Sequence, residues 1–399
     1  MIQANQEVDG DIPGSPGENP DVTVVLIVST LCNLRCRYCY EYPELANRHR
    51  ISELELELLF SRLARHYAAR APIHIRFAWQ GGEPLLHEPE YYRRALQRQA
   101  KIFRSSPHRL SNVLQTNLTV LDEARIELLR ECFDGVGVSH DVIGDLRVDA
   151  GGRPRTQTVE ANLDRLIEAQ VRIGGITVLS QQNVAEIAQI YRFWQARRLP
   201  FRLLPMHRGP LPTLGTMALS PSAVQRAFAE CFDLWLSDPG DPRPIAPLGE
   251  LVAAVLRARS AGSRLARYDR PRQAALLIIN PRGFVGGVND LLELGSAYGN
   301  LLDSSLEEIL AGQAFAQRAA QSEANVRQTC SRCPYFRVAC DGQPAAEGGK
   351  EFWQRDASGA PLCSIQRGTL AHIERRLTEV GLLGPAEAAA APHPEVAPA

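Results

Sequence analysis

Two hydrophobic periods alternate along the first half of the chain. Short apolar runs bounded by polar or turn residues predict six β-strands, over Val22–Val28, Ile73–Trp79, Asn112–Gln115, Gly135–Ser139, Ile173–Leu179 and Phe201–Leu204. Between them, apolar residues recur at helical spacing and predict helices over Ser52–Ala69, Pro89–Arg104, Leu121–Glu131, Thr158–Ala169 and Val184–Arg197. Strand–helix alternation of this kind predicts an α/β fold, with a parallel sheet and helices outside it.

The pattern changes near residue 220. Helical stretches at Ser222–Leu236 and Leu248–Ala258 lead into apolar runs at Ala274–Ile279 and Phe284–Val288, which a Pro-Arg-Gly turn separates. Ser305–Arg318 then predicts another helix. The second half therefore predicts a helical region followed by a smaller α+β unit.

Bulk composition excludes several classes of protein. The formal net charge of −1 gives no indication of a nucleic-acid partner, and no apolar run reaches the ~18 residues of a membrane span. The N-terminus lacks an export signal, so nine cysteines favour metal binding over disulfides and predict a reducing, cytoplasmic location. Cys132 and Cys231 lie singly on apolar helical faces, which predicts packing roles for both.

Seven cysteines remain, and three of them follow the first predicted strand. Cys32, Cys36 and Cys39 are spaced C-x3-C-x2-C on the loop that leaves Val22–Val28. Three thiolates this close can hold three irons of a [4Fe–4S] cube and leave the fourth iron open to a substrate or cosubstrate. A structural zinc site would need a fourth ligand nearby, and a disulfide would leave an odd thiol. The spacing therefore favours a cluster with one open iron.

This motif resembles that of the radical S-adenosylmethionine (SAM) enzymes, with Tyr38 as the aromatic residue before the last cysteine. A second family motif follows at Trp79–Pro84, where the Gly-Gly-Glu-Pro turn of that family receives the SAM amino group. The resemblance implies a partial (β/α)6 TIM-type barrel, in place of the eight units of a full barrel. Active sites of such barrels lie at the carboxyl ends of the strands.

The resemblance also assigns residues to the cofactor. The positions that match SAM-contacting segments of the family are Gly81, Gly82, Glu83, Pro84, Asn117, Ser139 and Arg147. Leu118 and Val142 stand where the family usually has glycines. Three polar residues at predicted strand ends, His140, Asp141 and His207, are candidates for proton transfer, and each is also compatible with an ordinary polar contact.

A second cysteine group lies near the C-terminus, at Cys330, Cys333, Cys340 and Cys363. Its spacing, C-x2-C-x6-C-x22-C, resembles that of the SPASM/Twitch extension, which carries auxiliary [4Fe–4S] clusters. The hairpin at Arg282–Asn289 and the pair Gln343-Pro344 lack the cysteines that would hold a second auxiliary cluster. We therefore expect one auxiliary cluster, and a four-cysteine zinc site is the alternative.

The resemblance implies reductive cleavage of SAM to a 5′-deoxyadenosyl radical, which abstracts a hydrogen atom from the substrate. SPASM-type enzymes mostly modify peptides, so the first hypothesis is a maturase of ribosomally made, post-translationally modified peptide (RiPP) precursors that forms a crosslink or oxidises a side chain. A dehydrogenase or epimerase of a small alcohol or sugar comes second. An anaerobic sulfatase maturase ranks lower because those enzymes keep three clusters, and a non-enzymatic iron–sulfur or zinc protein belongs to another class.

These expectations imply partners and boundaries. The peptide would be recognised at the barrel mouth or through a separate recognition protein, and a flavodoxin- or ferredoxin-type protein would donate electrons. We expect a disordered N-terminus over 1–20, the radical SAM partial barrel over 21–219, a helical bridging region over 220–272, the SPASM/Twitch-like domain over 273–383 and a disordered tail over 384–399.

Overall fold

The computed structural model describes residues 21–206, 215–259, 265–287, 296–347, 353–355, 359 and 361–384. His207 and Val288, the predicted end of a strand, lie outside the described residues. So do residues 1–20 and nearly all of the predicted tail.

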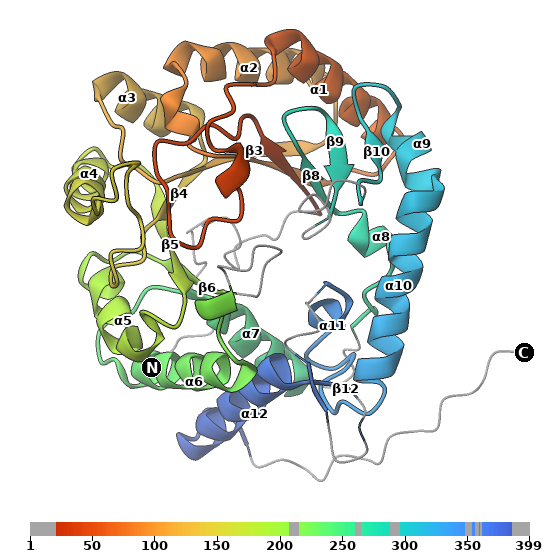
Figure 1. Cartoon of the computed structure of the whole chain (residues 1–399). Helices are drawn as coiled ribbons and strands as arrows, with labels where there is room; N and C mark the ends of the chain where they lie inside the picture. The colour runs from red at the N-terminus through yellow and green to blue at the C-terminus, as the bar shows by residue number, and fades with distance from the viewer. Residues whose placement is uncertain are drawn as a thin grey trace, which may run out of the picture.

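A ten-stranded sheet forms the centre of the molecule, in the order β10-β9-β8-β1-β2-β3-β4-β5-β6-β7 (Figure 1). The first seven strands are parallel neighbours in chain order: β1 (Val22–Ile27), β2 (His74–Gln80), β3 (Arg109–Thr116), β4 (Gly135–Ser139), β5 (Ile173–Leu179), β6 (Phe201–Pro205) and β7 (Ile245–Ala246). All six predicted strands are present, and the fold is the predicted open α/β barrel.

Helices form an outer arc around these strands (Figure 1). They are α1 (Glu53–Tyr67), α2 (Pro89–Ile102), α3 (Glu123–Cys132), α4 (Thr156–Glu168) and α5 (Ile187–Ala196), and short 3-10 helices lie at η1 (Tyr42–Glu44), η2 (Pro84–Leu86) and η3 (Val184–Glu186). The α1 helix begins with a capping box between Ser52 and Glu55.

Aromatic side chains fill the layer between strands and helices. Trp79 of β2 is fully buried and meets Phe60 of α1 edge-on at a centroid distance of 6.1 Å. Trp194 of α5 packs against Gly175 of β5, where a Cβ would lie 2.5 Å from the indole ring. Alternate side chains of each strand thus point outward into the core, and the others face the barrel interior.

The C-terminal half begins with α6 (Pro221–Ser237), α7 (Leu248–Arg259) and α8 (Arg270–Gln273). β8 (Leu276–Ile279) then pairs in parallel with β1, and β9 (Phe284–Gly286) and β10 (Gly299–Asn300) follow as antiparallel strands. The hairpin therefore extends the barrel sheet itself, and the expected boundary near residue 273 falls just before a strand of that sheet.

The predicted helix over Ser305–Arg318 is two helices, which corrects that prediction. α9 (Leu306–Ala311) ends at Gly312, whose extended backbone (ψ 160°) starts α10 (Gln313–Cys330) in a new direction. The remaining elements are α11 (Gln343–Glu347), β11 (Trp353–Arg355), β12 (Pro361–Cys363) and α12 (Ser364–Glu379). None of the described helices is both long and apolar enough to cross a membrane.

Candidate functional site

The three cysteines of the first group lie on the loop between β1 and α1, at the carboxyl edge of the sheet. Cys32 donates its backbone N–H to Leu45 O at 3.0 Å, and Cys39 donates to Cys36 O at 3.0 Å. All three thiols are free and partly exposed.

The surroundings of these thiols suit a bound metal group. Burial raises the pKa of Cys32 to about 11 and that of Cys39 to about 12, and the nearby thiols add to both shifts. Three thiolates together are therefore unfavourable without positive charge beside them, and cluster irons supply that charge. Three free thiols on one loop are the donor set of a [4Fe–4S] cluster with an open iron. No three Cys, His, Asp or Glu side chains of the described residues already lie together as the ligands of one metal ion, so this assignment of the cluster ligands stays a prediction from the motif.

The Gly-Gly-Glu-Pro turn at the end of β2 packs directly on this loop. Gly82 donates its N–H to Ser29 O at 2.9 Å, and Glu83 donates to Leu31 O at 2.8 Å. A Cβ at Gly82 would lie 2.2 Å from Leu31 O, and Gly81 has a φ of +146°. Glycine is thus required here for contact with the cysteine loop, and Pro84 then starts η2.

Glu83 ties this turn to the end of β3. The buried carboxylate accepts hydrogen bonds from Thr116 Oγ1 (2.7 Å), Asn117 N (2.6 Å) and Leu85 N (2.9 Å). Burial raises the pKa of Glu83, and these hydrogen bonds oppose the shift. Glu83 therefore fixes the position of Asn117, the next candidate along the edge.

Asn117 and Ser139 lie at the same edge as the cysteines. The Asn117 side-chain amide donates to Asn33 Oδ1 at 3.1 Å and to Cys32 Sγ at 3.7 Å. Ser139 accepts a hydrogen bond from Gln115 Nε2 at 3.2 Å. The structure thus places the candidate SAM-contacting residues of β2, β3 and β4 at one edge of the sheet, where the glycine turn and Asn117 contact the cysteine loop.

The two described proton-transfer candidates have different surroundings. His140 is buried with its ring 5.1 Å from Phe193 of α5 and its Nε2 3.3 Å from Glu160 of α4. These contacts direct His140 to the helical layer, which favours the packing role. Asp141 instead accepts a hydrogen bond from Tyr38 Oη at 2.6 Å, within the cysteine motif.

The connection between β4 and α4 also contacts the cysteine loop, which the sequence did not indicate. Residues 141–155, which we call the brace, connect β4 to α4. Arg35 N donates to Val148 O (2.6 Å) and Arg37 N donates to Leu146 O (2.9 Å), so the brace pairs with the loop on both sides of Cys36. Arg147, the candidate for the SAM carboxylate, belongs to this segment and contacts Asp141. No motif indicates this pairing, which depends on contacts distant in sequence.

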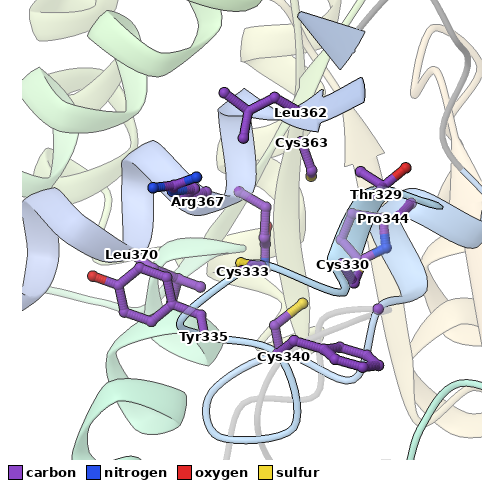
Figure 2. A pocket seen from close by; sticks show the side chains of 14 residues that line it. Thr329, Cys330, Cys333, Tyr335, Cys340, Pro344, Leu362, Cys363, Arg367 and Leu370 are labelled. Atoms are coloured by element: carbon purple, nitrogen blue, oxygen red, sulfur yellow. The ribbon is translucent and has the colours of Figure 1, made fainter. Parts of the chain in front are cut away.

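The second cysteine group converges on one pocket, although its members come from three elements. Cys330 ends α10, Cys333 and Cys340 lie on the following loop, and Cys363 ends β12 (Figure 2). Burial raises the pKa of Cys330 and of Cys340 to about 12, and the other thiols of the group add to both shifts. Four thiols around one pocket match in number the ligands of a [4Fe–4S] cluster or of a zinc ion. In the part of the chain that the structure describes they are not yet gathered as the ligands of one metal ion, so the auxiliary site stays a prediction.

The two other cysteines lie apart from both groups. Cys231 of α6 is fully buried in the core, and Cys132 at the end of α3 packs against the core while partly exposed. Both positions agree with the predicted packing roles.

The open β/α barrel and the three free cysteines after its first strand agree with the resemblance that the sequence motif indicates. Residues 26–193 match the family model of the Radical SAM superfamily, so the chain contains a radical SAM domain, and it is an enzyme. Its cofactors are accordingly S-adenosylmethionine and [4Fe–4S] clusters.

Several curated relatives are sulfatase-maturating enzymes. The serine-type anaerobic enzyme of Klebsiella aerogenes is 28% identical over 328 residues, which cover 80% of this chain and 78% of the relative. The cysteine-type anaerobic enzyme of Clostridium perfringens (strain 13 / Type A) is 23% identical over 334 residues, which cover 81% and 88%.

Solved structures share the fold. The structure of anSMEcpe with bound AdoMet and Cp18Cys peptide has a TM-score of 0.69 at 20% identity, covering 90% of this chain and 98% of that chain. Streptococcus suis SuiB bound to S-adenosylmethionine has a TM-score of 0.56 at 14% identity, covering 85% and 77%. The likeness extends through the C-terminal region, and at these identities it concerns the fold.

Proposed function

We propose that this radical SAM enzyme oxidises a side chain within a polypeptide substrate. The observation that carries the proposal is the similarity to sulfatase-maturating enzymes over about four-fifths of both chains. This similarity favours oxidation of a serine or cysteine residue over the RiPP crosslink that ranked first by sequence. The small-alcohol dehydrogenase has no comparable support.

In this proposal, Cys32, Cys36 and Cys39 hold the cluster that, with SAM bound, supplies the 5′-deoxyadenosyl radical. The Gly81–Pro84 turn, Asn117 and Ser139 bind and orient SAM at the carboxyl edge of β2, β3 and β4. Asp141, Arg147 and the brace hold the cysteine loop against this edge and keep water from it.

Oxidation of a serine CH₂–OH group to an aldehyde removes two hydrogens. One leaves as a hydrogen atom to form 5′-deoxyadenosine, and the other leaves as a proton and an electron. A cluster held by Cys330, Cys333, Cys340 and Cys363 would supply a one-electron acceptor. Each expected domain would have its own role: residues 21–219 would carry out the SAM chemistry, residues 220–272 would form the helical bridge, and residues 273–383 would hold the auxiliary site.

Two partners complete the proposal. A flavodoxin- or ferredoxin-type protein would supply electrons, and a separate recognition protein would present the polypeptide if the barrel mouth alone does not select it.

The first prediction tests the cysteine triad. The Cys32→Ala/Cys36→Ala/Cys39→Ala variant is expected to form no 5′-deoxyadenosine from SAM with dithionite under anaerobic conditions, because its cluster ligands are gone. It should still bind iron through the C-terminal group. Cys132→Ala, which removes a partly exposed cysteine outside both groups, is the matched control and should match the wild type. Formation of 5′-deoxyadenosine by the triple variant would overturn the assignment.

The substrate class is tested by mass spectrometry. Serine- and cysteine-containing peptides from the sulfatase substrates of the relatives are incubated with the enzyme, SAM and reductant. The proposal expects at least one of the two peptides to lose two hydrogens at its serine or cysteine side chain, in step with 5′-deoxyadenosine formation. Unchanged peptides, together with oxidation of a small alcohol or sugar, would contradict it.

A further inference from the structure

A buried charged array lies beside the cysteine loop. The Asp141 carboxylate accepts Tyr38 Oη at 2.6 Å and pairs with Arg147 Nε at 3.1 Å. The Arg147 guanidinium also stacks near the Tyr38 ring, 5.6 Å from its centroid. The side chains of Asp141 and Arg147 are only 4% and 11% exposed. A buried ion pair is costly to form, so its place next to the cysteine motif calls for a functional reason.

The backbone of the brace is bent to create this array. Val142 and Asp145 have φ values of +65° and +48°, and Gly144 between them has +97°. A positive φ is unfavourable for a β-branched residue such as Val142, and such strain concentrates at functional sites. The turn brings Arg147 back onto Asp141, which Val178 N of β5 also holds at 3.1 Å.

Of the three cysteines in the motif, Cys36 lies opposite this group of charged residues. The brace pairs with Arg35 and Arg37 on both sides of this cysteine. These two backbone hydrogen bonds end at Val148 and Leu146, the neighbours of Arg147, so Arg147 lies opposite Cys36. Arg147 is therefore a positive charge close to one of the three cluster ligands, and Asp141 offsets part of that charge.

We propose that Asp141 and Arg147 form a positioning pair that sets the reduction potential of the cluster held by Cys32, Cys36 and Cys39. Arg147 is the buried counter-charge beside Cys36, and Asp141 both orients Arg147 and limits its effect. The inference rests on the proposed function, because it requires a cluster at these cysteines. This role does not exclude a contact of Arg147 with the SAM carboxylate, because Asp141 engages only part of the guanidinium and the buried Nε has no hydrogen-bond partner among the described residues.

The two charges make opposite predictions. Reduction adds negative charge to the cluster, so a nearby positive charge stabilises the reduced state. Arg147→Gln leaves Asp141 unbalanced and is expected to shift the midpoint potential to a more negative value. Asp141→Asn leaves Arg147 unbalanced and is expected to shift it to a more positive value. The double variant restores the balance, so its potential should lie between those of the single variants.

The measurement is an anaerobic redox titration of the reconstituted full-length enzyme, followed by electron paramagnetic resonance, with iron content determined for each variant. To isolate the signal of this cluster, all variants carry Cys330→Ala and Cys333→Ala. Arg147→Lys keeps the charge and should stay near the parent potential. Arg153→Gln is the matched control, because Arg153 lies on the same brace and pairs with Asp149, yet its side chain is 81% exposed.

Tyr38→Phe keeps the test open if either single variant fails to fold. Tyr38 Oη donates a hydrogen bond that partly neutralises the Asp141 carboxylate. Without it, more of the negative charge acts on the cluster, so the midpoint potential is expected to become more negative. Shifts in the same direction for Arg147→Gln and Asp141→Asn would overturn the proposal, as would unchanged potentials at full iron content. Weaker SAM binding by Arg147→Gln at an unchanged potential would assign Arg147 to the SAM carboxylate instead. If the parent binds no iron at the triad, the proposed function itself fails.

Discussion

Glu83 illustrates how much of the site depends on single buried side chains. Its two carboxylate oxygens accept three hydrogen bonds, two at Oε1 from Thr116 and Leu85 and one at Oε2 from Asn117. The carboxylate therefore joins the ends of β2 and β3, and its loss leaves buried donors without acceptors.

Glu83→Gln tests this at the residue scale. The glutamine NH₂ must face one of the three donors, so we expect the free energy of unfolding to fall by about 1–3 kcal/mol. Glu90→Gln is the control, since Glu90 of α2 is 57% exposed and its arginine neighbours lie 3.9–4.0 Å away, which predicts a change within about 0.5 kcal/mol. Urea unfolding of both variants measures the difference. Equal effects would mean that the Glu83 network adds nothing to stability.

At this scale the sequence identified residue types better than contacts. The candidates Asn117 and Ser139 do lie at the predicted edge, because the carboxyl ends of parallel strands share one side of a sheet. The pairing of Arg147 with Asp141 was not predictable, because it depends on a turn with positive φ at Val142. A motif fixes spacing along the chain but not which of two nearby charges a guanidinium meets.

At the scale of elements, the central feature is the contact between the glycine turn after β2 and the loop after β1. The backbone atoms of Gly82 and Leu31 are so close that no side chain fits between them. The position of Cys32 therefore depends on a neighbouring strand end.

Gly82→Ala is expected to displace the cysteine loop, because the new Cβ would lie 2.2 Å from Leu31 O and 2.3 Å from Thr30 O. The reconstituted variant should lose about four irons, the content of one cluster, while the C-terminal site keeps its own. Gly215→Ala is the matched control, because a Cβ there meets nothing within 4 Å. Full iron content in Gly82→Ala would show that the loop adapts to the added methyl group.

Regular elements were predictable where burial is strong. β1 and β5 are covered by helices, so their sequences are mostly apolar, each interrupted by one threonine, and stand out from the flanking residues. β7 and β10 have two residues each, too few for any periodicity. The break at Gly312 was missed because helical spacing of apolar residues continues across it.

At the scale of the whole molecule, the two cysteine groups belong to one continuous architecture. α10 runs from the hairpin beside β8 to the four-cysteine pocket, and α12 packs along α6 next to the barrel (Figure 1). The salt bridge between Arg259 of α7 and Glu374 of α12 and the hydrogen bond from Tyr335 to Glu374 link the pocket to this helical layer. The sequence showed four cysteines, but only the fold shows that they share a pocket.

The cysteine inventory sets the metal content of the whole enzyme. Nine cysteines, less Cys132 and Cys231 on their separate helices, leave one set of three and one set of four. We therefore expect about eight irons per chain after anaerobic reconstitution, against about twelve for an enzyme with two auxiliary clusters. Iron and zinc analysis decides between the alternatives. About four irons with one zinc would make the C-terminal site structural.

Cys330→Ala/Cys333→Ala completes the test, because it removes two of the four ligands in the pocket. We expect it to lose about four irons and to retain SAM cleavage, since the triad is intact. Oxidation of the peptide should fall, because the electron left after hydrogen abstraction then lacks its nearby acceptor. Cys132→Ala/Cys231→Ser removes two cysteines outside both groups and should keep all of the iron. Full peptide oxidation at the reduced iron content would show that the four-cysteine pocket has no part in the reaction.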